Sequence, residues 1–148
     1  MRYLFTLLCC LTFLPLVSGC KDNRPESSLY NTRWMLVQVE DFPISLSSYS
    51  DTYRSYIEFT GGVDRTTGLG PCNSFGGTFS LGKEPGLLTI SQQASTKTSC
   101  GALNIETRYL EALPRTVRYE IKGRELRLYD ATNSIKPLLV FEDRTPTE

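Results

Sequence analysis

The residue with the clearest chemistry in this chain is Cys20, which follows a short apolar N-terminal stretch. Arg2 precedes residues 4–14, an apolar run that is too short to span a bilayer comfortably. Ser18 and Gly19 are the small residues that a signal peptidase requires before the bond it cleaves. This order is typical of a bacterial lipoprotein signal, so we expect cleavage after Gly19 and acylation of the Cys20 sulfur. The alternative is an ordinary secretory signal in which the cysteine is coincidental.

Two further thiols, Cys72 and Cys100, remain in the mature chain besides Cys20. An even pair in an exported domain favours a disulfide. In the chain-entropy model such a bridge would stabilise the fold by roughly 3–4 kcal/mol. The alternative is two separate buried thiols that pack as small apolar groups.

Side chains that commonly catalyse reactions are scarce in this sequence. The chain has no histidine, which removes the usual general base and the commonest metal ligand. The cysteines lack a C-x-x-C spacing, and we expect the paired carboxylates Glu40-Asp41 and Glu142-Asp143 to be solvated charges at strand ends. We therefore expect a binding or structural domain, not an enzyme, with no cofactor and no metal site.

Length and charge indicate one domain without a nucleic-acid surface. The 148 residues include 16 basic and 16 acidic ones, and loss of Arg2 with the signal leaves a net charge of about −1. No basic stripe stands out, which argues against nucleic acid as a partner. We expect a signal peptide over 1–19, a flexible tether over 20–28, a folded monomeric domain over 29–142 and a C-terminal tail over 143–148.

Short apolar segments bounded by glycine, proline and serine follow one another from residue 32 onward. This pattern predicts strands at 32–39, 56–59, 63–69, 75–81, 87–90, 95–99 and 138–141, with a loop over 41–52 and a turn over 83–86. So many short strands indicate a mainly β fold, in which an antiparallel sheet closes into a barrel or folds as a sandwich.

One helix interrupts the strands. Its apolar face recurs at the helical period through Ile105, Tyr109, Ala112 and Leu113. Asn104 is the expected N-cap, Glu106 suits the positive end of the helix dipole, and Pro114 ends the run. A helix this short is marginal alone, so we expect its apolar face to pack on the sheet.

The pattern over 117–129 predicts an antiparallel hairpin that turns at Gly123-Arg124. This register places Ile121 opposite Leu126, Glu120 opposite Arg127 and Lys122 opposite Glu125. A turn at 122–123 would instead set like charges opposite each other, which destabilises a ladder. The expected core-facing residues are Tyr119, Ile121, Leu126 and Leu128.

The segment 68–79 concentrates glycines, Cys72, Asn73 and two aromatic residues. Glycines within a strand pattern mark bends or a close approach of the backbone, and an asparagine amide satisfies backbone groups at such a bend. The segment fits either a barrel corner or the mouth of a ligand site, and turn chemistry favours the corner.

Residues 72–79, Cys-Asn-Ser-Phe-Gly-Gly-Thr-Phe, resemble the G-C-N-x-F-x-G-x-Y signature of the META domain, the HslJ-like family. The motif residues are Asn73, Phe75, Gly77 and Phe79. The other elements of the family pattern occur in the family's order along the chain, at 32–36 before this motif and at 96–100, 106–113, 118–128 and 138–141 after it. Pro71 and Ser99 depart from the family pattern, without a change of frame.

The resemblance implies a single small barrel-like sheet with one α-helix packed on it. The family has no established catalytic residues, so none can be assigned here. Its members are associated with bacterial envelopes, often as lipoproteins, with heat shock and with resistance to novobiocin.

Two functions compete on these grounds, and a third, an enzyme, is disfavoured by the absence of histidine. The first is a non-enzymatic envelope lipoprotein in stress response or envelope maintenance, acting through contacts with an unidentified envelope protein. The second is a barrel that holds a small apolar ligand. A core filled by residues such as Trp34, Phe59 and Phe75 would exclude the second. The candidate partner surfaces are the loop 45–53 and the helix surface near Arg108 and Glu111.

Membrane attachment would come from the acyl chains on Cys20, because no second apolar segment of the sequence is long enough to cross. Lys21 stands where an aspartate would retain an enterobacterial lipoprotein in the inner membrane. We therefore expect the outer membrane as the location.

Replacing Cys20 with serine should release the protein from the membrane, because the acyl chains would be its anchor. Fractionation of cells, followed by a high-salt wash of the membranes, measures this. A Cys20→Ser variant that still sediments with washed membranes would show that Cys20 is not the anchor.

Overall fold

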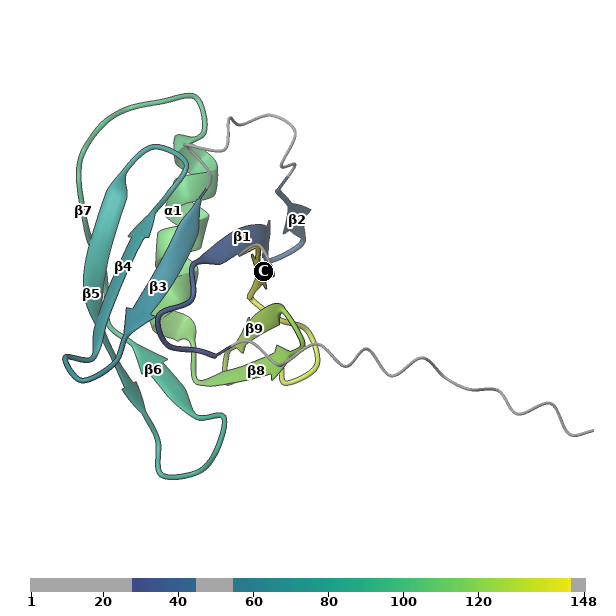
Figure 1. Ribbon diagram of the computed structural model, residues 1–148. Coiled ribbons are helices and arrows are strands. Elements are labelled where there is room, and N and C mark those ends of the chain that lie inside the picture. The colour runs from purple at the N-terminus through teal and green to yellow at the C-terminus, as the bar shows by residue number, and fades with distance from the viewer. Residues whose placement is uncertain (1–27, 45–54, 145–148) are drawn as a thin grey trace, which may run out of the picture.

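The structure is a computed structural model that describes residues 28–44 and 55–144 (Figure 1). The expected signal peptide, Cys20, the tether up to residue 27, the partner loop 45–53 and the last four residues of the tail lie outside the described residues.

The described chain is mainly β, as the sequence predicts. Its strands are β1 (Trp34–Val39), β2 (Phe42–Pro43), β3 (Tyr56–Thr60), β4 (Arg65–Leu69), β5 (Ser74–Leu81), β6 (Leu88–Ile90), β7 (Ala94–Ser95), β8 (Arg118–Lys122), β9 (Glu125–Tyr129) and β10 (Leu139–Asp143). They pair antiparallel in the order β6-β5-β4-β3-β1-β10-β9-β8, with β2 beside β1 and β7 beside β5.

The two ends of this order meet, so the sheet is a nearly closed barrel and not a sandwich. Leu87 forms a bridge with Arg118 beside β6 and β8. The Tyr119 N–H donates to the Gly86 carbonyl at 2.8 Å, and the Leu88 N–H donates to the Val117 carbonyl at 3.1 Å. Closure of this kind leaves few exposed strand edges.

Strand β1 is central, as its apolar residues on both faces predict. It pairs with β3 on one side and with β10 on the other, with an irregularity between Leu36 and Gln38. Trp34 is fully buried, and its ring N–H donates to the Leu29 carbonyl at 3.2 Å. The single tryptophan thus ties the start of the domain to the core.

Side chains fill the interior of the barrel. Fully buried large side chains from β1, β3, β6, β9 and β10, from α1 and from the 3-10 turn meet there: Trp34, Leu36, Ile57, Phe59, Leu88, Ile90, Tyr109, Leu113, Leu126, Leu128, Leu139 and Phe141. Within the described residues, this packing matches the filled core that argues against a carrier of apolar ligands.

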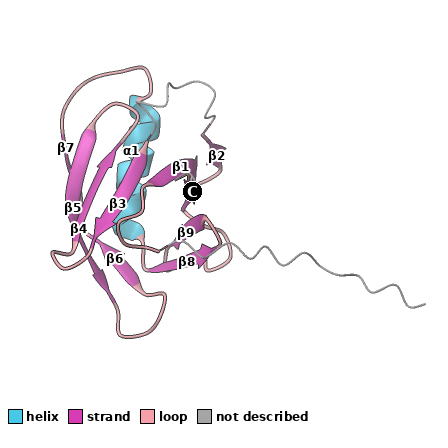
Figure 2. Ribbon diagram, in the orientation of Figure 1, coloured by secondary structure: helices cyan, strands magenta, loops and turns pink. Residues whose placement is uncertain are grey.

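The helix α1 (Leu103–Ala112) runs behind β3 and β4 in Figure 2 and continues into a 3-10 turn at Leu113–Arg115. Tyr109 and Ala112 are fully buried, so the expected apolar face does pack on the sheet. The predicted N-cap is wrong: Ala102 occupies that position, and Asn104 lies inside the helix. The Ile105 and Glu106 N–H groups both donate to the Ala102 carbonyl, which starts the helix earlier.

The predicted hairpin and its register are confirmed. Strands β8 and β9 pair Glu120 with Arg127, Ile121 with Leu126 and Lys122 with Glu125, and Gly123 turns the chain with a φ of 58°. The closest ion pairs, however, run along each strand. Lys122 binds Glu120 at 3.1 Å, and Arg127 binds Glu125. Hydrogen bonds from Lys122 and Tyr129 lower the pKa of Glu120 below its usual value.

Two expected loop and strand limits differ from the structure. Of the strand expected over 95–99, only Ser95 lies in a strand, because β7 ends there. The expected loop 41–52 contains the short strand β2, and Val63 belongs to a turn before β4.

Two tyrosines allow a matched test of this core. The buried Tyr109 hydroxyl has no hydrogen-bond partner among the described residues, and burial raises the pKa of Tyr109 well above its usual value. Tyr109→Phe should therefore stabilise the domain by about 1 kcal/mol, since an unpaired buried hydroxyl is unfavourable. Tyr129→Phe should destabilise it by about 0.5–1.5 kcal/mol, because the Tyr129 hydroxyl donates to Glu120 at 3.1 Å. Urea unfolding measures both, and equal effects of the two variants would contradict the assignment.

Candidate functional site

The two aromatic residues of the motif are core residues. The Phe75 ring stands edge-on to Tyr109 with 5.5 Å between ring centroids, and Phe79 stands edge-on to Phe59 at 5.2 Å. Both phenylalanines lie on β5 and are buried. They attach β5 to the helix and to β3, so their role is to position the residues around them.

Gly77 leaves room for a side chain from another segment. A Cβ atom at Gly77 would lie 2.5 Å from the Gln93 side-chain nitrogen and 2.7 Å from the Ser91 hydroxyl. Gln93 uses this space to accept a hydrogen bond from the Thr66 hydroxyl at 2.8 Å. The absence of a side chain at Gly77 therefore allows the chain after β6 to lie close against the barrel wall.

A buried carboxylate, Glu106, connects the helix to the motif. Glu106 is only 3% exposed. One of its oxygens accepts the backbone N–H groups of Cys72 at 2.8 Å and Asn73 at 2.7 Å, and the other accepts the Asn73 side-chain amide at 2.6 Å. A Cβ atom at Gly70 would lie 2.6 Å from this carboxylate. The chain before Asn73 therefore passes directly over Glu106.

The Asn73 side chain acts as one more peptide unit beside β5. Its Oδ1 accepts the Thr98 N–H at 2.6 Å and the Thr96 hydroxyl at 2.8 Å. Its amide nitrogen donates to the Thr98 carbonyl at 2.9 Å as well as to Glu106. A single buried amide thus continues the attachment of the segment 96–98 to β5 beyond the last backbone bond, which the Thr96 N–H donates to the Ser74 carbonyl.

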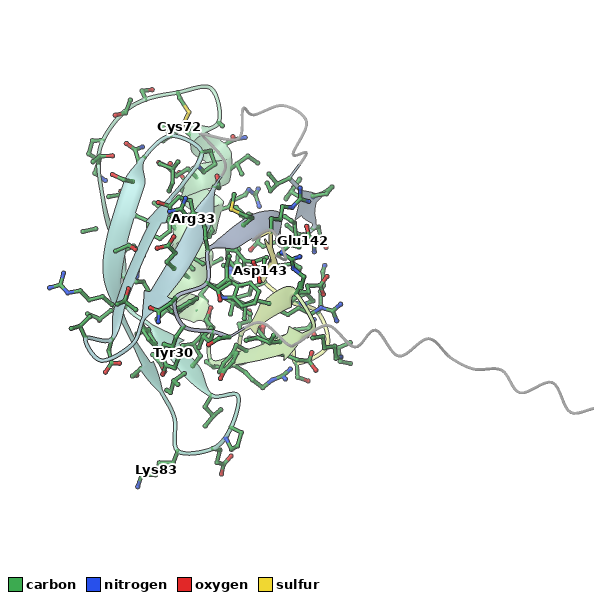
Figure 3. All side chains as sticks on the ribbon, viewed as in Figure 1. Tyr30, Arg33, Cys72, Lys83, Glu142 and Asp143 are labelled. Carbon is green, nitrogen blue, oxygen red and sulfur yellow. A yellow bond between two sulfur atoms is a disulfide. The ribbon has the colours of Figure 1, made fainter. Side chains whose placement is uncertain are left out.

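Cys72 and Cys100 form a disulfide with 5.8 Å between their Cα atoms. The bridge lies at the end of the molecule where the chain from β7 reaches α1 (Figure 3). It closes the loop that contains β5, β6, β7 and the segment 96–98, and one of its ends adjoins Asn73.

A groove of about 320 Å³ lies between this segment and the helix. One wall is the chain from Gln92 to Ser99, and the floor includes Asn73 and Glu106. The opposite wall is one stripe of α1 formed by Leu103, Thr107, Leu110 and Glu111. These helical positions recur at the period of one face, so the groove follows the helix along its length.

The comparison with known families gives one match. Residues 27–144 match the family model of the META domain. The chain belongs to the META domain family. A search of the curated proteins found no match.

Two solved structures resemble this META domain. One is the NMR structure of a protein from Burkholderia xenovorans, with 20% identity, 80% of this chain and 85% of that chain covered, and a TM-score of 0.61. The other is the crystal structure of a DUF4847 family protein from Bacteroides vulgatus, which is 14% identical. The match covers 81% of this chain and 96% of that chain, with a TM-score of 0.55. At these identities the likeness concerns the fold alone.

The groove of the META domain offers hydrogen bonds and charge. Its ionisable side chains are Lys97, Glu106 and Glu111. The described residues hold no cluster of histidine, cysteine, aspartate and glutamate that could bind a metal ion. Thr96 and Thr107 donate their hydroxyl hydrogens to Asn73 and to the Leu103 carbonyl, so neither is paired with an ionisable base. This chemistry suits recognition of a polar ligand.

The predicted partner surface near Arg108 and Glu111 divides into two parts. Glu111 lines the groove, whereas Arg108 and Arg115 both bind Glu40, at 3.1 and 3.0 Å. The hydrogen bonds that Arg115 donates to Glu40 and Asp130 raise the pKa of Arg115 above its usual value. This arginine surface is therefore neutralised by its own carboxylates.

The paired carboxylates near strand ends form ion pairs with neighbouring basic side chains. Glu40 binds the two arginines named above, and Asp41 binds Lys136. Glu142 binds Arg144 at 2.7 Å, and Asp143 lies 3.6 Å from Arg124.

Sequence reasoning missed the role of Glu106 and of the threonines 96 and 98. The sequence assigns Glu106 only to the helix dipole, and the residue does lie in the first turn of α1. The signal that could have identified its larger role is a glutamate on the apolar side of the helix, three residues before the buried Tyr109. A charged residue in that position needs partners, and the motif supplies them.

Asn73→Asp tests the amide between the carboxylate and the extended segment. The introduced carboxyl would replace the amide nitrogen 2.6 Å from Glu106, so the variant should lose at least about 2 kcal/mol at pH 7. The neighbouring carboxylate raises the folded-state pKa of the introduced carboxyl above its unfolded value of about 4. The loss should therefore be greatest above the raised pKa and shrink as the pH falls through it.

Urea unfolding of the variant and the wild type at several pH values measures this difference. Thr96→Val is the control, because it removes one hydrogen bond without a charge and should lose about 0.5–1.5 kcal/mol at every pH. A pH-independent loss in Asn73→Asp would contradict the proximity of the two carboxyl groups.

Proposed function

We propose that this META domain protein is a lipid-anchored, non-enzymatic binding protein of the bacterial envelope, and that its contact surface is the groove between α1 and the segment 92–99. The observation that carries this proposal is the groove itself, whose floor is built from the motif residue Asn73 and its partner Glu106. A role of the motif in shaping a binding surface would explain why Asn73 and Glu106 meet at the floor of the groove.

The packed interior of the barrel supports a surface site. Trp34, Ile57, Phe59 and Leu128 are fully buried in one cluster, so the described core is occupied by its own side chains. Nothing in the described residues favours an apolar ligand inside the barrel.

The proposed anchor is the acylated Cys20. No helix among the described residues is long and apolar enough to cross a bilayer. With its lipid in the outer membrane, the folded domain would stand off on the tether and expose the groove to envelope proteins. A disulfide-stabilised domain suits this oxidising compartment. We place its activity in stress response or envelope maintenance, in line with the family resemblance.

Site-specific photo-crosslinking in living cells tests the proposal. A photoreactive amino acid at Thr107, on the groove wall, should give a discrete heavier product with an envelope protein. The same residue at Lys83 should not, because Lys83 lies in the turn between β5 and β6, at the end of the molecule away from Cys72 (Figure 3). The product from Thr107 should also depend on Cys20, since Cys20→Ser removes the expected anchor.

The amount of product from each position, and its dependence on Cys20, decide between the outcomes. A discrete adduct from Thr107 that needs Cys20 supports the proposal. Adducts of equal amount from Thr107 and Lys83, or none from Thr107, would overturn the groove as the contact surface. An adduct from Thr107 that persists in Cys20→Ser would overturn the lipid anchor.

A further inference from the structure

We propose that the groove binds an extended peptide that carries a lysine or arginine, and that the peptide backbone adds as a further strand along Ser95 and Lys97. This inference rests on the proposed function, because it specifies what the groove receives. It follows from the backbone of residues 95–98 and from the charge of Glu106 in the floor of the groove.

The segment after β6 presents alternate backbone groups in opposite directions. In the pairing of β5 with β7, Phe75 lies opposite Ser95, and the next rung is a hydrogen bond from the Thr96 N–H to the Ser74 carbonyl at 3.1 Å. Hydrogen-bonded and non-hydrogen-bonded pairs alternate in an antiparallel ladder. The N–H and C=O of Ser95 therefore point away from β5.

The same alternation continues beyond β7. Thr98 directs its N–H and C=O inward to the Asn73 amide, at 2.6 and 2.9 Å. Lys97, between Thr96 and Thr98, has no backbone hydrogen bond within the described residues. Ser95 and Lys97 thus offer two outward donor and acceptor pairs, spaced as in a strand edge, and an added strand satisfies such groups.

The edge is held in place before any ligand arrives. Asn73 fixes its inner side, and the Cys72–Cys100 disulfide fixes the chain two residues after Thr98. A strand edge that is already extended loses little conformational entropy when a peptide pairs with it. This preorganisation distinguishes the segment from an ordinary surface loop.

The charge of the groove selects a basic peptide. Glu106 accepts three N–H groups, whereas a carboxylate has about four acceptor positions. Within the described residues Glu106 has no ion-pair partner, and Glu111 lines the same groove. Lys97 is the one basic residue of the lining, so a negative charge remains for a cationic side chain to balance.

The helix wall provides contacts for the other side chains of the peptide. Leu103 and Leu110 are separated by two helical turns on the groove side of α1, with Thr107 between them. The opposite wall consists mostly of serine and threonine, whose side chains are small, so space remains for the side chains of the peptide. An extended peptide places alternate side chains on one face, so small apolar residues flanking the basic one fit this wall.

A positional-scanning library of acetylated hexapeptides, applied to the full-length protein in detergent micelles, tests the specificity. We expect enrichment of lysine or arginine at one position. Replacement of that residue by norleucine should weaken binding at least about tenfold, as loss of a charge-assisted hydrogen bond does. No enrichment, or enrichment of acidic residues, would overturn the inference.

Lys97→Pro tests the strand pairing. Proline removes the outward N–H of residue 97 together with the lysine side chain, and an edge position tolerates it. The variant should bind the selected peptide at least about tenfold more weakly, whereas Lys97→Ala, which keeps the N–H, should bind as well as the wild type or better. Unchanged urea unfolding and an intact disulfide show that Lys97→Pro is folded, and equal binding by the two folded variants would overturn the added strand.

The readouts separate this inference from the proposed function. Crosslinks from Thr107 together with a Lys97→Pro variant that binds normally would leave the groove as a contact surface but overturn the strand mode. Should Lys97→Pro fail to fold, methylation of alternate backbone nitrogens in the selected peptide makes the same test from the ligand side. Binding that survives methylation at every position would overturn backbone pairing.

Discussion

The interaction on which the rest of this structure depends is the burial of the Glu106 carboxylate against the backbone of Cys72 and Asn73. A carboxylate removed from water is strongly destabilising unless donors replace its hydration. Glu106 receives three N–H groups at 2.6–2.8 Å, two of them from adjacent peptide units. The chain at 72–73 must therefore turn both of its N–H groups toward the helix, which determines where β5 begins.

This contact also explains how a helix of ten residues is held on the sheet. Alone, such a helix is marginal in water. Glu106 attaches its first turn to the barrel wall, and the anion lies near the positive end of the helix dipole. The buried Tyr109 and Ala112 then pack on the core along the next turns. Polar attachment at one end and apolar packing at the other leave the stripe through Thr107 facing outward.

The parts of the fold that depend on local pattern were predictable, and those that depend on distant partners were not. Alternation and charge opposition place the hairpin turn at Gly123-Arg124 with the correct register, because both signals lie within a few residues. The strand expected at 95–99 is wrong beyond Ser95, because after one backbone bond from the Thr96 N–H to β5 the chain is held by the side chain of Asn73 and not by a strand. The Glu106 contact joins residues 33 apart in sequence, and no periodicity reports such a contact.

The same distant contact connects the fold to recognition. The Asn73 amide is shared between Glu106 and Thr98, so the helix, the motif and the extended segment are parts of one hydrogen-bonded unit. Its apolar neighbours, Phe75 and Phe79, are buried and give the unit a rigid base. The proposed site needs no histidine and no metal, because rigid donors and acceptors would bind an extended polar chain without reorganisation. In the proposed binding mode, the motif holds a strand edge open beside a buried negative charge.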